Sequence, residues 1–157
     1  MNKNRRSIVQ AGASVAAIGW VGAVHSAEGG HDIALALAIK QYVGDAVVRV
    51  GKVKLDVAEL VENGNTVPVS VAVDSPMTAS DHVKSIAIFN ERNPQRDVAR
   101  FTLGPRSGRA GVATRIRLAT TQKLVAIAQL SDGSHWSHSL DVIVTRSEER
   151  RVGKECA

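Results

Sequence analysis

The chain contains one cysteine in 157 residues, Cys156, directly before the C-terminal residue. An intramolecular disulfide is therefore excluded, and the thiol is available either to another chain or to chemistry. Aromatic residues are also scarce: two Trp, two Phe and one Tyr. Because bases stack on aromatic side chains in many single-strand binders, this composition argues against a nucleic-acid partner.

Acidic residues are absent before Glu28. Residues 1–27 begin with a basic head that includes Arg5 and Arg6, followed by a stretch rich in alanine, glycine and valine. Paired arginines ahead of an apolar segment are typical of bacterial twin-arginine export signals. The stretch is interrupted by Gln10 and several glycines, which makes it too weakly apolar for a membrane span. We expect a cleavable signal peptide at 1–27, a periplasmic mature protein and no membrane span after processing.

The signal also carries much of the positive charge. The whole chain has a formal net charge of +5, whereas residues 28–157 hold 17 basic and 15 acidic residues, a net charge of +2. About 130 residues is the size of one domain with its own core, and the apolar content of 44% is that of a globular protein.

Residues 28–46 predict a short helix at the start of the mature chain. Leu35, Ile39 and Val43 recur at helical spacing, Asp32 is a candidate N-cap, and Gly44 supplies a stop.

After this segment the apolar period changes to two, which indicates strands with one buried face. Turn residues such as Asn63-Gly64, Asn93-Pro94 and Asp132-Gly133 separate the runs. Residues 47–145 therefore predict an all-β, immunoglobulin-like β-sandwich of about seven strands, with a closed barrel as the alternative. The cysteine pair and core tryptophan of antibody domains are missing, so the likeness is architectural. The expected strands are 47–55, 67–73, 86–88, 98–103, 112–118, 124–130 and 135–145.

No residues form a recognisable catalytic or metal set. His135 and His138 are three apart on an expected strand and so point to opposite faces, as surface or edge histidines do. A copper site would need histidines and a methionine converging on the cysteine, yet no histidine follows Cys156 and Met77 falls in a turn. The sequence predicts no enzyme, no catalytic residue, no metal and no cofactor.

Arginines are concentrated in one part of the chain. Two interpretations stay open: a solvated strand face, since Arg115 and Arg117 alternate with Ile116 and Leu118, or a cationic surface for an anionic ligand or acidic partner. The seven arginines are Arg92, Arg96, Arg100, Arg106, Arg109, Arg115 and Arg117.

Several segments carry motifs that are more specific than their composition. The ordered set includes Glu-Asn-Gly, Val-Pro-Val and Asp-Ser-Pro-Met within 51–77, together with Arg-Ile-Arg-Leu-Ala at 115–119. Residues 89–95, 103–109 and 130–134 add to it. From the leader to about Thr145 the chain closely resembles SoxY, the sulfur-carrier subunit of the bacterial thiosulfate-oxidising system.

The resemblance implies a carrier rather than an enzyme. Members of this family combine an immunoglobulin-like sandwich with a C-terminal arm ending in Gly-Gly-Cys-Gly-Gly, whose cysteine holds the sulfur intermediate covalently. The implied partners are a SoxZ-type sandwich subunit, the haem cytochrome SoxAX that loads the thiol, the manganese hydrolase SoxB that releases sulfate, and a sulfur dehydrogenase. Flanking glycines let such an arm enter narrow channels.

The C-terminal segment departs from that pattern. Seven of the twelve residues in 146–157 are charged, and Gly153 is the only glycine. Cys156 then has two interpretations: it is the sulfur-attachment thiol on a disordered extension, or it belongs to a tail foreign to the protein. The abrupt change of composition favours a foreign tail.

A function of another class also fits the sequence. An exported immunoglobulin-like module could bind or assemble through its arginine-bearing face without carrying any substrate covalently.

Overall fold

The computed structural model describes residues 28–145. The expected signal peptide at 1–27 and the tail at 146–157, with Cys156, lie outside the described residues. The described part contains one α-helix, a short 3-10 helix and nine strands. They are α1 (Glu28–Val43), β1 (Val48–Val50), β2 (Val53–Val57), β3 (Leu60–Val61), β4 (Val67–Val73), β5 (Val83–Asn90), β6 (Asp97–Thr102), η1 (Pro105–Ser107), β7 (Gly111–Ile116), β8 (Gln122–Leu130) and β9 (His135–Val144).

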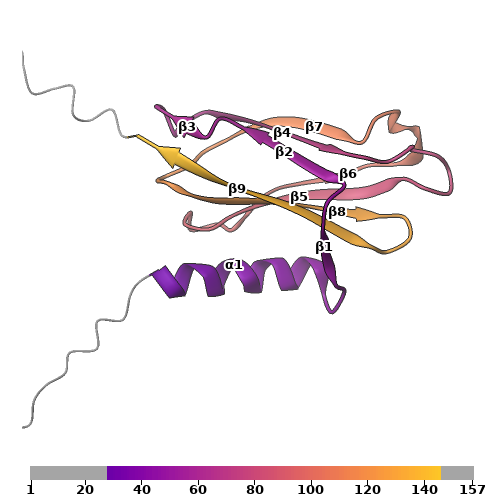
Figure 1. The fold of residues 1–157 in the computed structure, drawn as a ribbon, viewed down its shortest axis with the longest axis horizontal. Coiled ribbons are helices and arrows are strands. Elements are labelled where there is room, and N and C mark those ends of the chain that lie inside the picture. Colours follow the sequence, from indigo (N-terminus) through magenta and orange to yellow (C-terminus); the bar gives the residue numbers. More distant parts are fainter. Residues whose placement is uncertain (1–27, 146–157) are drawn as a thin grey trace, which may run out of the picture.

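The strands form two sheets that face each other. The larger sheet has the order β1-β9-β8-β5-β6, with β3 also paired to β9, and the smaller sheet has the order β2-β4-β7. Strands β1 and β3 run parallel to β9, and the other pairs are antiparallel. Helix α1 lies on the outside of the larger sheet (Figure 1). The expected all-β sandwich with an N-terminal helix is confirmed.

The strand count is nine rather than the expected seven because β3 was not expected and because the segment expected as one strand, 47–55, is two. Gly51 adopts φ +123° and Lys52 φ +53°, which turns the chain between β1 and β2. As a result β1 joins the larger sheet and β2 the smaller one. A Cβ at position 51 would lie 3.5 Å from the Trp136 ring, so the indole packs directly against this turn.

Two hydrophobic clusters form the core. Strand β4 alternates strictly, with Val67, Val69, Val71 and Val73 buried between the sheets. Strand β5 does not alternate, because both of its faces are covered. Ile86 and Ile88 belong to the cluster between the sheets, whereas Ala87 and Phe89 belong to the cluster beneath α1.

Helix α1 packs on the larger sheet through Leu35 and Val43, which join the cluster of Phe89 and Ile127. Gly44 adopts φ +69°, and its N–H donates to the Lys40 carbonyl at 2.8 Å, which confirms the expected helix stop. The expected N-cap at Asp32 is wrong. The helix already includes Glu28, so Asp32 lies inside it.

Substitution of Gly64 tests the tightest backbone approach. A Cβ at this position would lie 2.2 Å from the Leu118 carbonyl oxygen, a group that cannot rotate away. We expect Gly64→Ala to lower the free energy of unfolding by about 2 kcal/mol, measured by urea denaturation. Gly104→Ala is the control, because no atom lies within 4 Å of its added Cβ. Equal stability of the two variants would contradict this packing.

Candidate functional site

The last described residues of the chain are held on one side by β3. Register places Leu60 beside Ile143 and Val61 beside Val144. The Ile143 N–H donates to the Glu59 carbonyl at 2.7 Å, and the Thr145 N–H donates to the Val61 carbonyl at 2.9 Å. This two-residue strand therefore fixes the backbone up to the point where the C-terminal segment begins.

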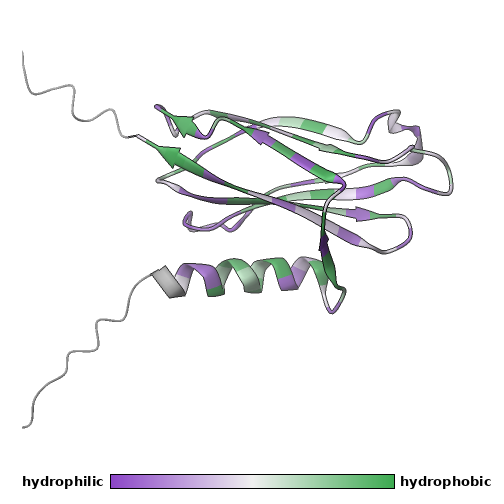
Figure 2. Cartoon of the chain, viewed as in Figure 1, coloured by the Kyte–Doolittle hydropathy of each residue, from purple (hydrophilic) through white to green (hydrophobic). Residues whose placement is uncertain are grey.

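The C-terminal end of β9 is held on its other side by the loop before β8. The Val144 N–H donates to the Thr121 hydroxyl at 3.0 Å. Figure 2 shows β3 and the end of β9 coloured as hydrophobic, and Leu60 and Ile143 are indeed 60% and 51% exposed. The C-terminal segment thus leaves the sandwich beside an exposed apolar pair.

The loop at 117–121 is itself held by Asn93. The Asn93 side chain accepts from the Ala119 N–H at 3.2 Å and from the Gln122 amide at 2.9 Å, and it donates to the Arg117 carbonyl at 2.7 Å. Buried Gln122 accepts from the Arg92 N–H at 2.8 Å. Sequence reasoning marked Asn93-Pro94 only as a turn and gave Gln122 no role. No local sequence signal marked Gln122, because its burial and its place at the start of β8 are seen only in the structure.

These contacts form a fixed base for whatever follows Thr145. Cys156 lies eleven residues beyond Thr145, so its Cα can be at most about 40 Å from this base. The arrangement can position a terminal thiol at a limited radius, while residues 28–145 contain no cysteine.

The two histidines lie on opposite sides of β9, as the sequence predicts. The His138 Nδ1 accepts from the Leu55 N–H at 3.1 Å and so links β9 to β2, whereas the His135 ring meets Tyr42 edge-on at 6.2 Å. The expectation of a surface position is wrong for His135, which is 4% exposed. It is buried because the Tyr42 end of α1 covers it.

The seven arginines do not form one surface. Arg96 contacts the Asn93 carbonyl and the His31 ring, Arg106 and Arg109 are exposed around η1, and Arg115 lines an open groove on the outer face of β4 and β7. Arg115 and Arg117 are both exposed and alternate with buried Ile116 and Leu118, as the interpretation of a solvated face expects, although β7 itself ends at Ile116. The arginines therefore divide among separate local roles.

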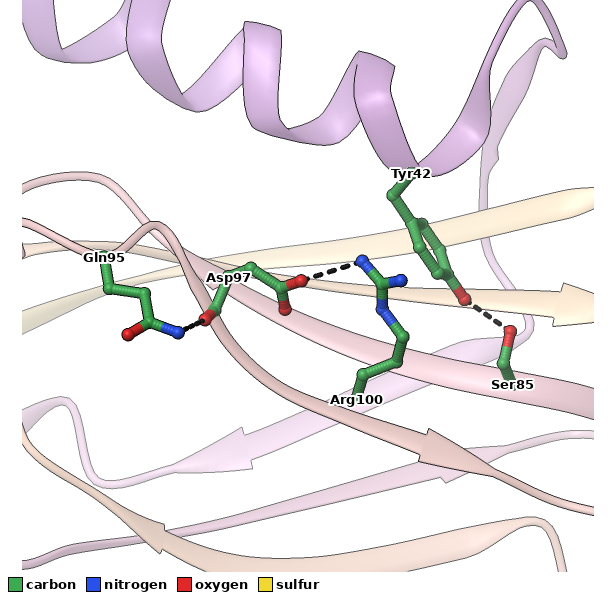
Figure 3. Close-up of polar contacts among 5 residues, drawn as sticks. All are labelled: Tyr42, Ser85, Gln95, Asp97 and Arg100. Atoms are coloured by element: carbon green, nitrogen blue, oxygen red, sulfur yellow. Dashed lines mark hydrogen bonds and ion pairs between the residues drawn. The ribbon is translucent and has the colours of Figure 1, made fainter.

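Arg100 has a structural partner on each side. Its guanidinium donates to the Asp97 carboxylate at 2.8 Å and lies over the Tyr42 ring at 4.8 Å (Figure 3). The Tyr42 hydroxyl is 2.5 Å from the Ser85 hydroxyl. Burial raises the pKa of Tyr42 above its usual value, and the Ser85 hydrogen bond and the Arg100 charge oppose that rise. These contacts hold the C-terminal part of α1 on the sheet.

Two negative findings apply to the described range alone. Within residues 28–145 no three His, Cys, Asp or Glu side chains are grouped so that they could hold a metal ion. Over the same range no helix has the length and apolarity needed to cross a membrane.

Comparison with known proteins gives the family. The sequence profile of the family "Sulfur oxidation protein SoxY" matches residues 39–147. The chain belongs to the SoxY family. The SoxY sulfur carrier protein of Chlorobium limicola f thiosulfatophilum has a similar structure, with 31% sequence identity and a TM-score of 0.60. The similarity covers 71% of this chain and 96% of that SoxY.

More distant structures share the fold. A superoxide reductase (neelaredoxin) from Ignicoccus hospitalis is 20% identical with a TM-score of 0.54, and the similarity covers 60% of this chain and 80% of that one. A putative superoxide reductase from Thermotoga maritima is 19% identical with a TM-score of 0.53. The similarity covers 63% of this chain and 93% of that one. No curated protein sequence matches the chain. These comparisons confirm the resemblance to SoxY that the sequence motifs indicated.

Removal of the Asn93 side chain tests the fixed base. We expect Asn93→Ala to cost about 1–3 kcal/mol of stability, since three groups lose their partner, and to speed hydrogen exchange at the Ala119 and Val144 amides. Asn63→Ala is the control, because the Asn63 side chain is exposed and accepts a single bond from the Asn65 N–H. Unchanged exchange at Val144 in Asn93→Ala would show that the loop does not support β9.

Titration of Tyr42 tests the contacts beneath α1. Tyr42 is the only tyrosine, so the ultraviolet absorbance of phenolate reports it alone. We expect a folded-state pKa above about 10, the ordinary value. Because the folded-state pKa is raised, the contribution of Tyr42 to stability is fully present below the ordinary value and is lost as the pH rises through the raised pKa.

As the pH is raised from about 8 to about 11, the native chain should therefore lose stability relative to Tyr42→Phe. Urea denaturation at the two pH values measures this difference. A titration midpoint at or below the ordinary value would contradict the burial of Tyr42.

Proposed function

We propose that this chain is a sulfur carrier of thiosulfate oxidation in the periplasm, and that it carries the sulfur covalently on a C-terminal thiol. One observation carries the proposal: the described fold aligns with nearly the whole of a SoxY sulfur carrier protein, at 31% identity. The twin-arginine pattern at 1–27 supports export to the compartment in which such a carrier works.

The proposed chemistry takes place on the thiol, while the enzymes are other proteins. In loading, the cysteine sulfur and the outer sulfur of thiosulfate form an S–S bond. This step releases two electrons and the thiol proton, and a haem cytochrome of the SoxAX type accepts the electrons. In the next step, water and a manganese hydrolase of the SoxB type release sulfate and two protons and leave a persulfide anion on the carrier. The thiolate is the reactive form.

The fixed base at Thr145 supports a carrier whose thiol is separate from the enzymes that act on it. The end of β9 is held by two hydrogen bonds to the backbone carbonyls of Glu59 and Val61 and by one to the Thr121 hydroxyl. A thiol carried beyond Thr145 would be tethered at this base, while the sandwich is available to a SoxZ-type subunit and to docking enzymes, including a sulfur dehydrogenase.

Cys156 is the only thiol in the chain, so a covalent adduct on this sequence must form there. Its neighbours Lys154 and Glu155 have opposite effects on thiolate formation. A foreign tail is the alternative interpretation, in which the carrier cysteine of the protein lies in a C-terminal sequence that this chain lacks.

Intact-mass measurement tests the proposal. The chain is incubated with thiosulfate, a SoxZ-type subunit and the haem cytochrome. We expect the mass to increase by one thiosulfate-derived group, and the increase to be absent in Cys156→Ser. An adduct that persists in Cys156→Ser would contradict attachment at this residue.

A grafted chain distinguishes the tail from the body. In this variant residues 146–157 are replaced by a spacer that ends in Gly-Gly-Cys-Gly-Gly. Loading of the graft alone would identify the tail of this chain as foreign and retain the carrier role for the body. If neither chain is loaded while a SoxY control is, the carrier proposal fails.

A further inference from the structure

The outer face of the smaller sheet is open to a partner. Strands β2, β4 and β7 form the layer of the sandwich that lies on the side opposite α1 (Figure 1). Along β4 the valines point to the core, whereas Pro68, Ser70 and Ala72 point outward and are exposed or partly exposed. A groove of about 740 Å³ lies over this face. The described part of the chain therefore leaves a hollowed sheet face uncovered.

The register of the smaller sheet determines which charged side chains border this groove. On β2, Asp56 lies beside Ser70, and on β7, Arg115 lies beside Pro68. Both charged residues are exposed and line the groove. Strands β2 and β7 are about 10 Å apart, which is twice the spacing of neighbouring strands. The groove therefore runs along β4 with charged side chains on both of its margins.

A second arginine lies on the β7 margin. A Cβ at Gly111 would lie 3.6 Å from the Cδ of Arg109, and position 111 faces the same side of β7 as Ala113 and Arg115. The stem of Arg109 therefore crosses the outer face of the strand. Since Gly111 and Arg115 are four residues apart, the two arginines occupy places about 13 Å apart along β7.

The positive charges of this face are not neutralised by the rest of the described chain. Within residues 28–145 neither Arg109 nor Arg115 makes an ion pair. Lys54, which lies beside Ala72 on β2, makes none in that range either. Asp56 is the one acidic residue that points outward from the three strands. With three positive charges and one negative charge, the face has a net charge of +2.

The charge and spacing of these side chains indicate the chemistry of the occupant. A groove with excess positive charge favours a negatively charged ligand, and arginine forms paired hydrogen bonds with carboxylates. Two arginines about 13 Å apart match carboxylates four residues apart on an extended polypeptide. Nucleic acid is a poorer fit, because β2, β4 and β7 contain no aromatic residue on which a base could stack.

We propose that the outer face of β2, β4 and β7 binds an acidic segment of a partner protein. The segment lies along β4, and its carboxylates contact Arg109 and Arg115. Asp56 restricts which segments bind, because a carboxylate on the β2 side of the groove meets a like charge. The acidic residues of the bound segment therefore face β7. The inference does not depend on sulfur carriage, because none of these side chains holds the fixed base at Thr145.

Fluorescence anisotropy of a labelled peptide tests the proposal on the full chain. The probe is a serine-rich peptide with glutamates four residues apart. We expect it to bind the native chain at low ionic strength and to bind more weakly as salt is added. Arg109→Gln combined with Arg115→Gln should weaken binding roughly tenfold, because two carboxylate contacts are lost. The matched control is Lys40→Gln combined with Lys84→Gln, which removes the same charge from exposed positions on α1 and β5 and should leave binding unchanged.

Substitution of Asp56 tests the sign of the charge effect. Asp56→Asn should strengthen binding of the glutamate peptide roughly threefold, because a like charge leaves the groove. Asp45→Asn makes the same change of charge after the end of α1 and should have no effect. Circular dichroism confirms that each variant is folded.

Several outcomes would overturn the proposal. They are no binding of the glutamate peptide to the native chain, equal binding of a matched lysine peptide, and binding that the two arginine substitutions leave unchanged. Tighter binding of single-stranded DNA or of anionic lipid vesicles through the same arginines would also overturn it, since the occupant would then not be a protein segment. A chain that fails to bind the peptide but still takes up sulfur would leave the carrier proposal intact.

Discussion

Burial of both faces of β5 and β8 is the constraint on which the rest of the structure depends. The two strands pair through most of their length, from Val83 and Leu130 to Asn90 and Leu124. Their inner faces pack against the smaller sheet, and their outer faces, with Phe89 and Ile127, need a second cover. Helix α1 covers these outer faces, so the helix is part of the hydrophobic core.

This constraint also explains which strands could be predicted from the sequence. Strand β4 has one buried face, and its valines alternate with exposed or partly exposed residues, so its bounds were predicted as they are found. Strand β5 is buried from Ile86 to Asn90 without alternation, and only Ile86 and Ile88 gave a period-two signal. The split at Gly51 was missed because valines continue on both sides of it, although the change of sheet rests on a glycine with positive φ.

The base of the C-terminal segment could not be predicted for a different reason. Its hydrogen bonds come mainly from backbone groups of Glu59 and Val61, whose side chains carry no sign of that role. Asn93 was identified as a turn residue, yet its partners lie 24 to 29 residues away, and such long-range pairing has no local pattern. Asn93, Arg117 and Ala119 nevertheless all lie within the segments that carry the family motifs, 89–95 and 115–119.

A protein that carries a thiol on a terminal segment needs a fixed point of attachment for that segment. Each residue released from the end of β9 would lengthen the reach of the tail by about 3.3 Å, but the same release would remove a hydrogen bond that fixes the direction of departure. The parallel pairing of β3 with the last residues of β9 fixes both the starting point and the direction of the chain at Thr145. If the chain carries sulfur as we propose, the fixed origin would restrict the volume available to the thiol and raise its effective concentration at an enzyme docked on the sandwich.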